Sequence, residues 1–151
     1  MIIKLNKIPF VKSHANGNDF ILLQADSFPK KFRKTNYIKH LCDRNYGIGA
    51  DGLFIISSSD NYDFFIDYYN SDGTWETLCA NGSRCVAQFM YKEGLVKKNM
   101  LFETGDGIHS ASVLDNELIS MSMNPPQYKS DCISPKGYEG YFVDTGARHF
   151  V

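Results

Sequence analysis

The chain has 151 residues, of which 43% are hydrophobic and 22% are charged, close to the values of ordinary globular proteins. This composition excludes a disordered, collagen-like or coiled-coil chain and fits one domain, or one domain with part of a second. Sixteen Lys and Arg against 17 Asp and Glu give a formal charge of -1, so we expect no nucleic-acid partner and no anionic membrane partner. A small molecule is the expected ligand.

The sequence contains no apolar run long enough for a transmembrane helix and no cleavable signal peptide, so we expect a cytoplasmic protein. Four cysteines in such a chain favour free thiols over a disulfide framework. The spacing of Cys79 and Cys85 is too wide for a zinc knuckle, and no second pair follows, so we expect no metal site.

The first half of the chain predicts two strands, a helix and a hairpin. Residues 1–10 alternate apolar and polar side chains and predict a strand, followed by a polar turn at 13–19 and a second strand over 20–24. Apolar residues recur at helical spacing from Thr35 until Gly47, with Cys42 on the apolar face. The β-branched and aromatic runs at 53–57 and 63–70 predict a hairpin.

The second half predicts one buried helix and further short strands. The helix begins beside Cys79 and is closed by Gly94, and its cysteine at position 85 is expected to pack inside the protein. Strands are predicted over 100–104, 111–115 and 117–123, which makes an α+β domain, and over 141–145. The helix residues expected to be buried are Val86, Ala87, Phe89, Met90 and Leu95.

Cys79 is the strongest candidate for a reactive residue. The first turn of the helix that follows holds Asn81, Gly82 and Ser83, so the sulfur is expected to meet free backbone N–H groups and the positive end of the helix dipole. Such surroundings can lower the pKa of a thiol from ~8.5 to between ~3.5 and ~7.5, which predicts a thiolate at neutral pH. A buried structural cysteine is the competing interpretation.

Three other segments offer polar groups to a ligand. In residues 14–19, Asn18 and its polar neighbours either bind a ligand or form a plain turn. Asn70 precedes a turn signal and has the same two interpretations. His149 is either an acid/base or ligand contact, or a structural histidine. The glycine-rich residues 47–52 lack the Lys and Ser/Thr of a phosphate-binding loop.

Four motifs, in this order, resemble those of one known family. They are HANGNDF (14–20), DRNYGIGADGL (43–53), YNSDGTWETLCANGSRC (69–85) and DTGARHFV (144–151). Together they resemble the N-terminal half of diaminopimelate epimerase, a pyridoxal-independent amino-acid epimerase whose fold family includes proline racemase. The resemblance covers nearly the whole chain and implies an α+β lobe, with a mixed or antiparallel sheet curled around a central helix.

The resemblance also implies a mechanism that needs no cofactor and uses two cysteines. One thiolate removes the α-proton of an amino acid while a thiol on the opposite face returns a proton. Cys79 matches the first of these cysteines, and the implied reaction converts LL- to meso-2,6-diaminopimelate, a precursor of lysine and peptidoglycan. The positions that match the family's substrate-binding residues, including the N–H donors for the substrate carboxylate, are Asn18, Asn70, Ala80, Asn81, Gly82 and His149.

The sequence departs from the family pattern at several positions. Ala80 replaces the usual glycine, and the G-x-P-H segment contains Ala147 and Arg148, so the resemblance is more specific for the family than for the substrate. The second cysteine belongs to an ACGSG-like motif that these residues do not contain, and Cys132 does not match it. We therefore expect residues 1–124 to form the N-terminal lobe, residues 125–151 to form a linker and the first strand of an incomplete second lobe, and this chain alone to be inactive.

Three alternatives remain open. A racemase of a different amino acid would use the same residues. A homodimer would bring two Cys79 thiols to one cavity. A non-catalytic binding module would hold an amino acid through the asparagines and the helix start without changing it. A cysteine hydrolase has less support, because no Cys–His pair has a recognisable local spacing.

Overall fold

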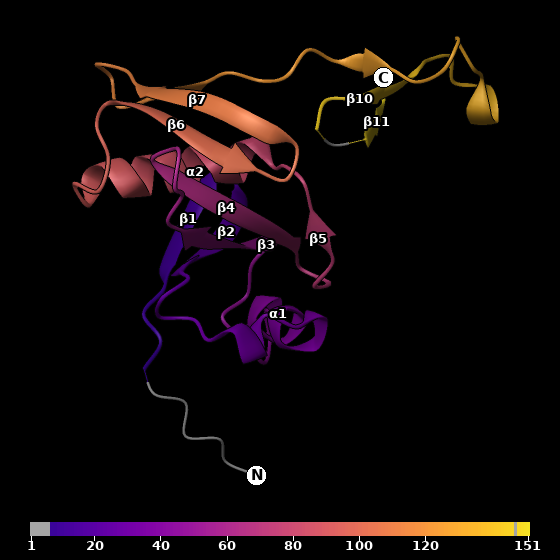
Figure 1. The fold of residues 1–151 in the computed structure, drawn as a ribbon. Coiled ribbons are helices and arrows are strands. Elements are labelled where there is room, and N and C mark those ends of the chain that lie inside the picture. The colour runs from indigo at the N-terminus through magenta and orange to yellow at the C-terminus, as the bar shows by residue number, and fades with distance from the viewer. Residues whose placement is uncertain (1–6, 147) are drawn as a thin grey trace.

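A computed structural model describes residues 7–146 and 148–151. Its centre is a curved sheet of eight strands around a long helix (Figure 1). This arrangement confirms the predicted α+β fold. Along the sheet the strands are β1 (Val11–Ala15), β2 (Asn18–Gln24), β3 (Gly52–Ser57), β4 (Phe64–Asn70), β6 (Asn99–Thr104), β7 (Gly107–Val113) and β8 (Ile119–Met121), and β5 (Trp75–Glu76) pairs with β4.

The first hairpin is centred on Asn16 and Gly17, whose φ angles are +54° and +85°. Positive φ at both central residues is what a tight two-residue hairpin turn requires, and an Asn-Gly pair tolerates it. The turn fixes the register, so β1 is the segment directly before it and pairs antiparallel with β2. The predicted strand over residues 1–10 is therefore wrong for residues 7–10, which form no strand, and residues 1–6 lie outside the described residues.

The strands β2 and β3 have a core on each face. They pair in parallel, and successive side chains along each strand point to opposite faces of the sheet. Phe20 and Phe54 pack toward the central helix, while Ile21 and Leu53 pack toward α1 (Thr35–Cys42) on the other face. The predicted first helix and the predicted β3–β4 hairpin are confirmed.

The central helix is α2 (Ala80–Lys92), which begins and ends close to its predicted bounds. Cys85, Val86, Ala87 and Met90 are buried in it, as expected. Phe89 is only half-buried, although it packs against the same core. Leu95 is 56% exposed, contrary to expectation, because the helix has already ended and the chain turns at Gly94 with φ +69°.

The sheet has a short seam between β4 and β6. These two strands pair in parallel through two residue pairs, Phe64 with Phe102 and Phe65 with Glu103. The rings of Phe64 and Phe102 stack there, with centroids 5.1 Å apart. Helix α2 contacts β1, β2 and β3 on one side of the seam and β7 and β8 on the other. The helix therefore joins the two halves of the sheet.

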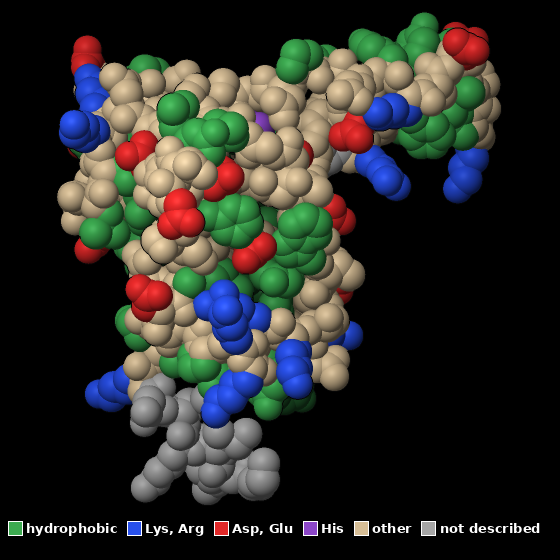
Figure 2. All heavy atoms as spheres, in the orientation of Figure 1, with side chains coloured by type: hydrophobic (Ala, Val, Ile, Leu, Met, Phe, Trp, Pro, Cys, Tyr) green, Lys and Arg blue, Asp and Glu red, His purple; other side chains and the backbone are tan. Residues whose placement is uncertain are grey.

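The last described residues form a second, smaller sheet. Its order is β11 (Arg148–Phe150), β10 (Phe142–Asp144) and β9 (Gln127–Tyr128), and all its pairings are antiparallel. This sheet projects from the body of the molecule and overhangs it (Figures 1 and 2). Strand β10 confirms the strand predicted over 141–145. In the described part of the chain, no helix is long and apolar enough to cross a membrane.

Candidate active site

A cavity of about 790 Å³ lies between β4, β5, the start of α2 and the projecting β10–β11 segment. Two of the predicted site residues do not line it. Asn18 lies behind Asn81, to which it is hydrogen-bonded, and Gly82 is buried within α2. The other predicted site residues line the cavity, and they are Asn70, Cys79, Ala80, Asn81 and His149.

Cys79 is the residue at which extended chain becomes helix. Its backbone is extended (φ −136°, ψ 107°), and its carbonyl accepts the first helical hydrogen bond, from the Ser83 N–H at 2.8 Å. Because Cys79 is the N-cap residue, its side chain lies next to the unpaired N–H groups of the first turn. The N–H groups of Asn81 and Gly82 lie close enough to lower the pKa of its thiol, but the side chain accepts no capping hydrogen bond. Two of the three predicted carboxylate donors therefore lie next to the thiol.

The predicted lowering of the Cys79 pKa is wrong in its net direction. Burial raises the pKa of this thiol above its usual value, and it outweighs the nearby N–H groups of Gly82 and Asn81, the Tyr68 hydroxyl and the charge of Arg84, which all act to lower it. The half-buried sulfur is the physical reason, since desolvation disfavours the charged thiolate. Hydrogen-bond donors therefore lie near Cys79, but its side chain is mostly a neutral thiol at neutral pH.

Asn70 starts a turn and also lies on the cavity wall. Its backbone starts a turn, with the Gly73 N–H donating to its carbonyl at 2.9 Å, while its side chain lines the cavity. The amide Nδ2 donates to Thr74 Oγ1 at 3.2 Å, and Oδ1 accepts from the Tyr68 hydroxyl at 2.7 Å. These contacts fix which end of the amide faces each neighbour.

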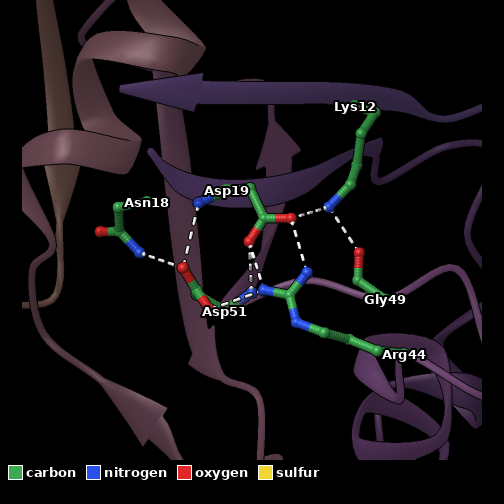
Figure 3. Close-up of polar contacts among 6 residues, drawn as sticks. All are labelled: Lys12, Asn18, Asp19, Arg44, Gly49 and Asp51. Atoms are coloured by element: carbon green, nitrogen blue, oxygen red, sulfur yellow. Dashed lines mark hydrogen bonds and ion pairs between the residues drawn. The ribbon is translucent and has the colours of Figure 1, made fainter. Parts of the chain in front are cut away.

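Behind Asn18 lies a network of charges that joins three segments of the chain (Figure 3). Arg44 donates to both oxygens of Asp19, at 3.1 and 2.7 Å, and to Asp51 at 2.8 Å. Lys12 pairs with Asp19 from β1. Arg44 holds the pKa of Asp19 well below its usual range, and the hydrogen bond from Asn18 lowers the pKa of Asp51. Both carboxyl groups are therefore ionised at neutral pH.

This network sets the orientation of Asn18. Its Nδ2 donates to Asp51 at 2.9 Å, so its Oδ1 points the other way and accepts from Asn81 Nδ2 at 3.2 Å. Asn81 Oδ1 in turn accepts a hydrogen bond from Arg84, one turn further along α2. These hydrogen bonds link the exposed charge network to the cavity wall. The carboxylate of Asp51 can only accept hydrogen bonds, and it therefore selects the orientation of the Asn18 amide.

The projecting segment is attached to the cavity through Gly146. Thr77 Oγ1 donates to the Gly146 carbonyl at 2.6 Å, and a Cβ at Gly146 would lie 2.3 Å from Asp106 Oδ2. His149 and Arg148 follow on β11 and line the cavity from that side. The neighbouring residue 147, an alanine, lies outside the described residues.

Three residues that belong to this arrangement were not predicted from the sequence. Tyr68 lines the cavity, and Asp51 and Arg44 orient Asn18. Asp51 was noticed only within a glycine-rich segment, and no local pattern marks a tyrosine in a strand as part of a site. In the described residues, no group of three His, Cys, Asp or Glu side chains could hold a metal ion. Cys132 is exposed and is not among the residues that line the cavity.

The fold is shared with about half of several solved structures. A probable proline racemase from Agrobacterium radiobacter matches with a TM-score of 0.74 at 14% identity, over 95% of this chain and 51% of that one. A PhzF-family phenazine biosynthesis protein from Bacillus anthracis matches with a TM-score of 0.66 at 20% identity, over 95% of this chain and 53% of that one. The curved sheet around α2 is thus one half of the fold found in this class of proteins.

The sequence comparisons identify the family. The profile described as diaminopimelate epimerase matches residues 10–129. The diaminopimelate epimerase of Flavobacterium psychrophilum is 38% identical over 143 residues, which is 93% of this chain and 53% of that protein. The diaminopimelate epimerase of Aquifex aeolicus is 34% identical, over 94% of this chain and 56% of that protein. The chain belongs to the diaminopimelate epimerase family and spans about half the length of the curated relatives it matches.

Proposed function

We propose that this chain supplies one half of the active site of an amino-acid epimerase, with diaminopimelate as the substrate. The observation that carries the proposal is the position of Cys79, at a helix start that lines a cavity, next to the backbone N–H groups of the first turn and with Asn70 in the same wall. Family membership supports the choice of substrate. The other thiol of the implied two-cysteine mechanism comes from outside the residues described.

The chemistry that these residues support is proton transfer at an α-carbon. A Cys79 thiolate accepts the α-proton, and the pair of electrons left on the carbon is stabilised as an enolate of the substrate carboxylate. Donors at a helix start favour such developing negative charge. The asparagine side chains at 70 and 81 offer both amide N–H donors and carbonyl acceptors to the amino and carboxylate groups of the substrate. No cofactor is needed for these steps.

Two residues set this site apart within its family. Ala80 adds a methyl group to the cavity wall where the family motif has glycine, and Arg148 brings a positive charge to the opposite wall. Both differences are compatible with the second candidate function, a racemase of a different amino acid. Arg148 favours a substrate with a second carboxylate, a requirement that diaminopimelate meets.

The test is α-hydrogen exchange in D2O, followed by NMR and chiral chromatography. A single thiol removes a proton and returns a deuteron on the same face, so we expect the chain to label one stereochemical configuration of diaminopimelate without forming the epimer. Cys79→Ser should abolish labelling while leaving saturable binding intact. Binding with no exchange in the wild-type chain would instead favour the non-catalytic binding module.

The same experiment separates a monomeric half-site from a homodimer. If two copies place two Cys79 thiols across one cavity, the labelled product includes the epimer, and light scattering gives twice the mass of the chain. A panel containing proline, aspartate and glutamate tests the alternative substrates. We infer a cytoplasmic role in the supply of lysine and peptidoglycan precursors, as a consequence of the proposed substrate.

A further inference from the structure

Tyr68 connects two groups of the candidate site. It lies on β4 and lines the same cavity as Cys79 and Asn70. Its hydroxyl donates to Asn70 Oδ1 at 2.7 Å, and its side chain packs against the same core cluster as Cys79, close enough for each group to affect the pKa of the other. A single phenol therefore lies beside both the proposed base and a proposed substrate ligand.

The ring of Tyr68 is held by aromatic packing. It stacks on Phe54 with centroids 4.8 Å apart and an interplanar angle of 22°, and its edge contacts Phe20 at 6.4 Å. Phe54 and Phe20 are both 0% exposed. Because a ring packed against two buried aromatic side chains keeps one rotamer, the hydroxyl stays at its place in the cavity wall.

Two glycines make room for this stack. A Cβ at Gly52 would lie 2.7 Å from Tyr68 Cε2 and 3.2 Å from its hydroxyl oxygen. A Cβ at Gly82 would lie 2.0 Å from Phe54 Cε2. Neither glycine has a positive φ, so backbone conformation does not require glycine at these positions. Glycine is required there because a side chain would collide with the aromatic rings. Strand β3 and helix α2 are thus both adapted to one position of the Tyr68 ring.

The tyrosine hydroxyl has one proton for two acceptors. While Cys79 is a thiol, its S–H can donate to the phenol oxygen, and the phenol proton serves Asn70 Oδ1. When the thiol has lost its proton to solvent, the phenol proton is free to turn to the sulfur, which leaves Asn70 Oδ1 available to a substrate ammonium group. We propose that Tyr68 is a positioning residue whose hydroxyl holds the Cys79 thiolate and thereby releases Asn70 for the substrate.

The charges around the two groups agree with this role. Burial, followed by the nearby Cys79, raises the pKa of Tyr68 above its usual range, so the phenol remains a donor at neutral pH. The nearby Tyr68 hydroxyl lowers the pKa of Cys79 against the larger effect of burial. The negative charge of Asp51, the residue just before β3, also raises the pKa of Tyr68. The other titratable and charged groups near the two side chains or on the cavity wall are Arg84, Cys85, Glu76, Asp144, Arg148 and His149.

The test is the pH dependence of Cys79 alkylation by iodoacetamide, with each cysteine quantified by peptide mass spectrometry. Tyr68→Phe removes the hydroxyl and keeps the ring. Loss of a hydrogen bond to a charged group should make alkylation at pH 8 about tenfold slower, with an unchanged limiting rate at high pH. The matched control is Tyr69→Phe, because the neighbouring Tyr69 packs on the other face of the sheet. Its alkylation profile should equal that of the wild type.

An unchanged Cys79 profile in Tyr68→Phe would overturn the proposal. Exposed Cys132 is an internal reference, since its rate should be the same in every variant. Alkylation of the buried Cys42 would reveal unfolding. If Tyr68→Phe is unfolded, Phe54→Leu is tested instead, because it keeps the Tyr68 hydroxyl and removes the ring on which Tyr68 stacks. A slower rate at pH 8 then supports the proposal and an unchanged one refutes it.

The proposal rests on the proposed function only in treating Cys79 as the reactive thiol. Alkylation needs no substrate, so the two ideas fail separately. A shifted alkylation profile without α-hydrogen exchange would keep Tyr68 as the partner of the thiol and reject the epimerase. Exchange with an unshifted profile would keep the epimerase and reject the role of Tyr68.

Discussion

The start of α2 offers a substitution in which two well-known effects oppose each other. Gly82→Ala should stabilise the helix by about 1 kcal/mol, since alanine is the better helix former. The new methyl carbon, however, would lie 2.0 and 2.1 Å from two carbons of the Phe54 ring. Carbon atoms in contact are ~3.5–4.0 Å apart, so the ring or the helix must move by roughly 1.5 Å.

The packing effect should be the larger one. Phe54 is 0% exposed and lies between Phe20, with ring centroids 5.3 Å apart, and Tyr68. A ring held on both sides has little freedom to yield, which places the cost near the upper end of overpacking, about 3 kcal/mol. After the helical gain, Gly82→Ala should destabilise the chain by about 2 kcal/mol. For a chain of this length the melting temperature should fall by about 4–8 °C.

Thermal and urea unfolding followed by circular dichroism would measure this change, with a double-mutant cycle as the control. In a Phe54→Leu background the smaller side chain leaves space for the methyl group, so Gly82→Ala should be neutral or stabilising there. The coupling free energy between the two positions should be about 2 kcal/mol. A wild-type or higher melting temperature for the single Gly82→Ala variant would refute the packing argument.

Two further predictions concern stability. The pKa of Asp19 is lowered in the folded chain, so the unfolded chain binds a proton at this residue first as the pH falls. The stability that Asp19 contributes is therefore full above about pH 4 and is lost as the pH falls toward the folded-state pKa. Urea titrations should show the loss, and Arg44→Gln should make it smaller, whereas an identical pH dependence in that variant would contradict the assignment. His109 is 1% exposed and contacts Asp106 at 2.9 Å and the Ser122 carbonyl at 3.1 Å. His109→Leu should therefore cost about 2 kcal/mol because it removes both polar contacts of a buried side chain, and a melting temperature equal to that of the wild type would show that these hydrogen bonds contribute no net stability.

Most of the fold could be predicted because its elements follow local rules. The Asn16-Gly17 pair specifies a hairpin, the helical spacing after Thr35 specifies α1, and the β-branched and aromatic runs specify β3 and β4. The position of β1 was not predictable from its own residues. Its sequence VKSHA has little apolar character, and it is a strand because the turn places it opposite β2.

The candidate site was predictable only where the chain carries a motif. Cys79 and its helix start follow from the sequence near position 79, but the direction of the thiol pKa depends on burial by segments far away in the chain. Likewise Tyr68 and Asp51 acquire their roles from β-sheet pairing, which places β3 beside β4. Long-range packing decides both effects, and no local spacing contains that information.

The short seam between β4 and β6 has a consequence for cooperativity. Two residue pairs give little resistance to local opening, so the backbone hydrogen bonds of the sheet alone would let the β6–β8 meander separate from β1–β4 as an independent unit. Helix α2 is what prevents this, because it packs on both units. A ligand bound at the first turn of α2 therefore stabilises the whole sheet against local opening, because any opening that frees the helix must also release the ligand.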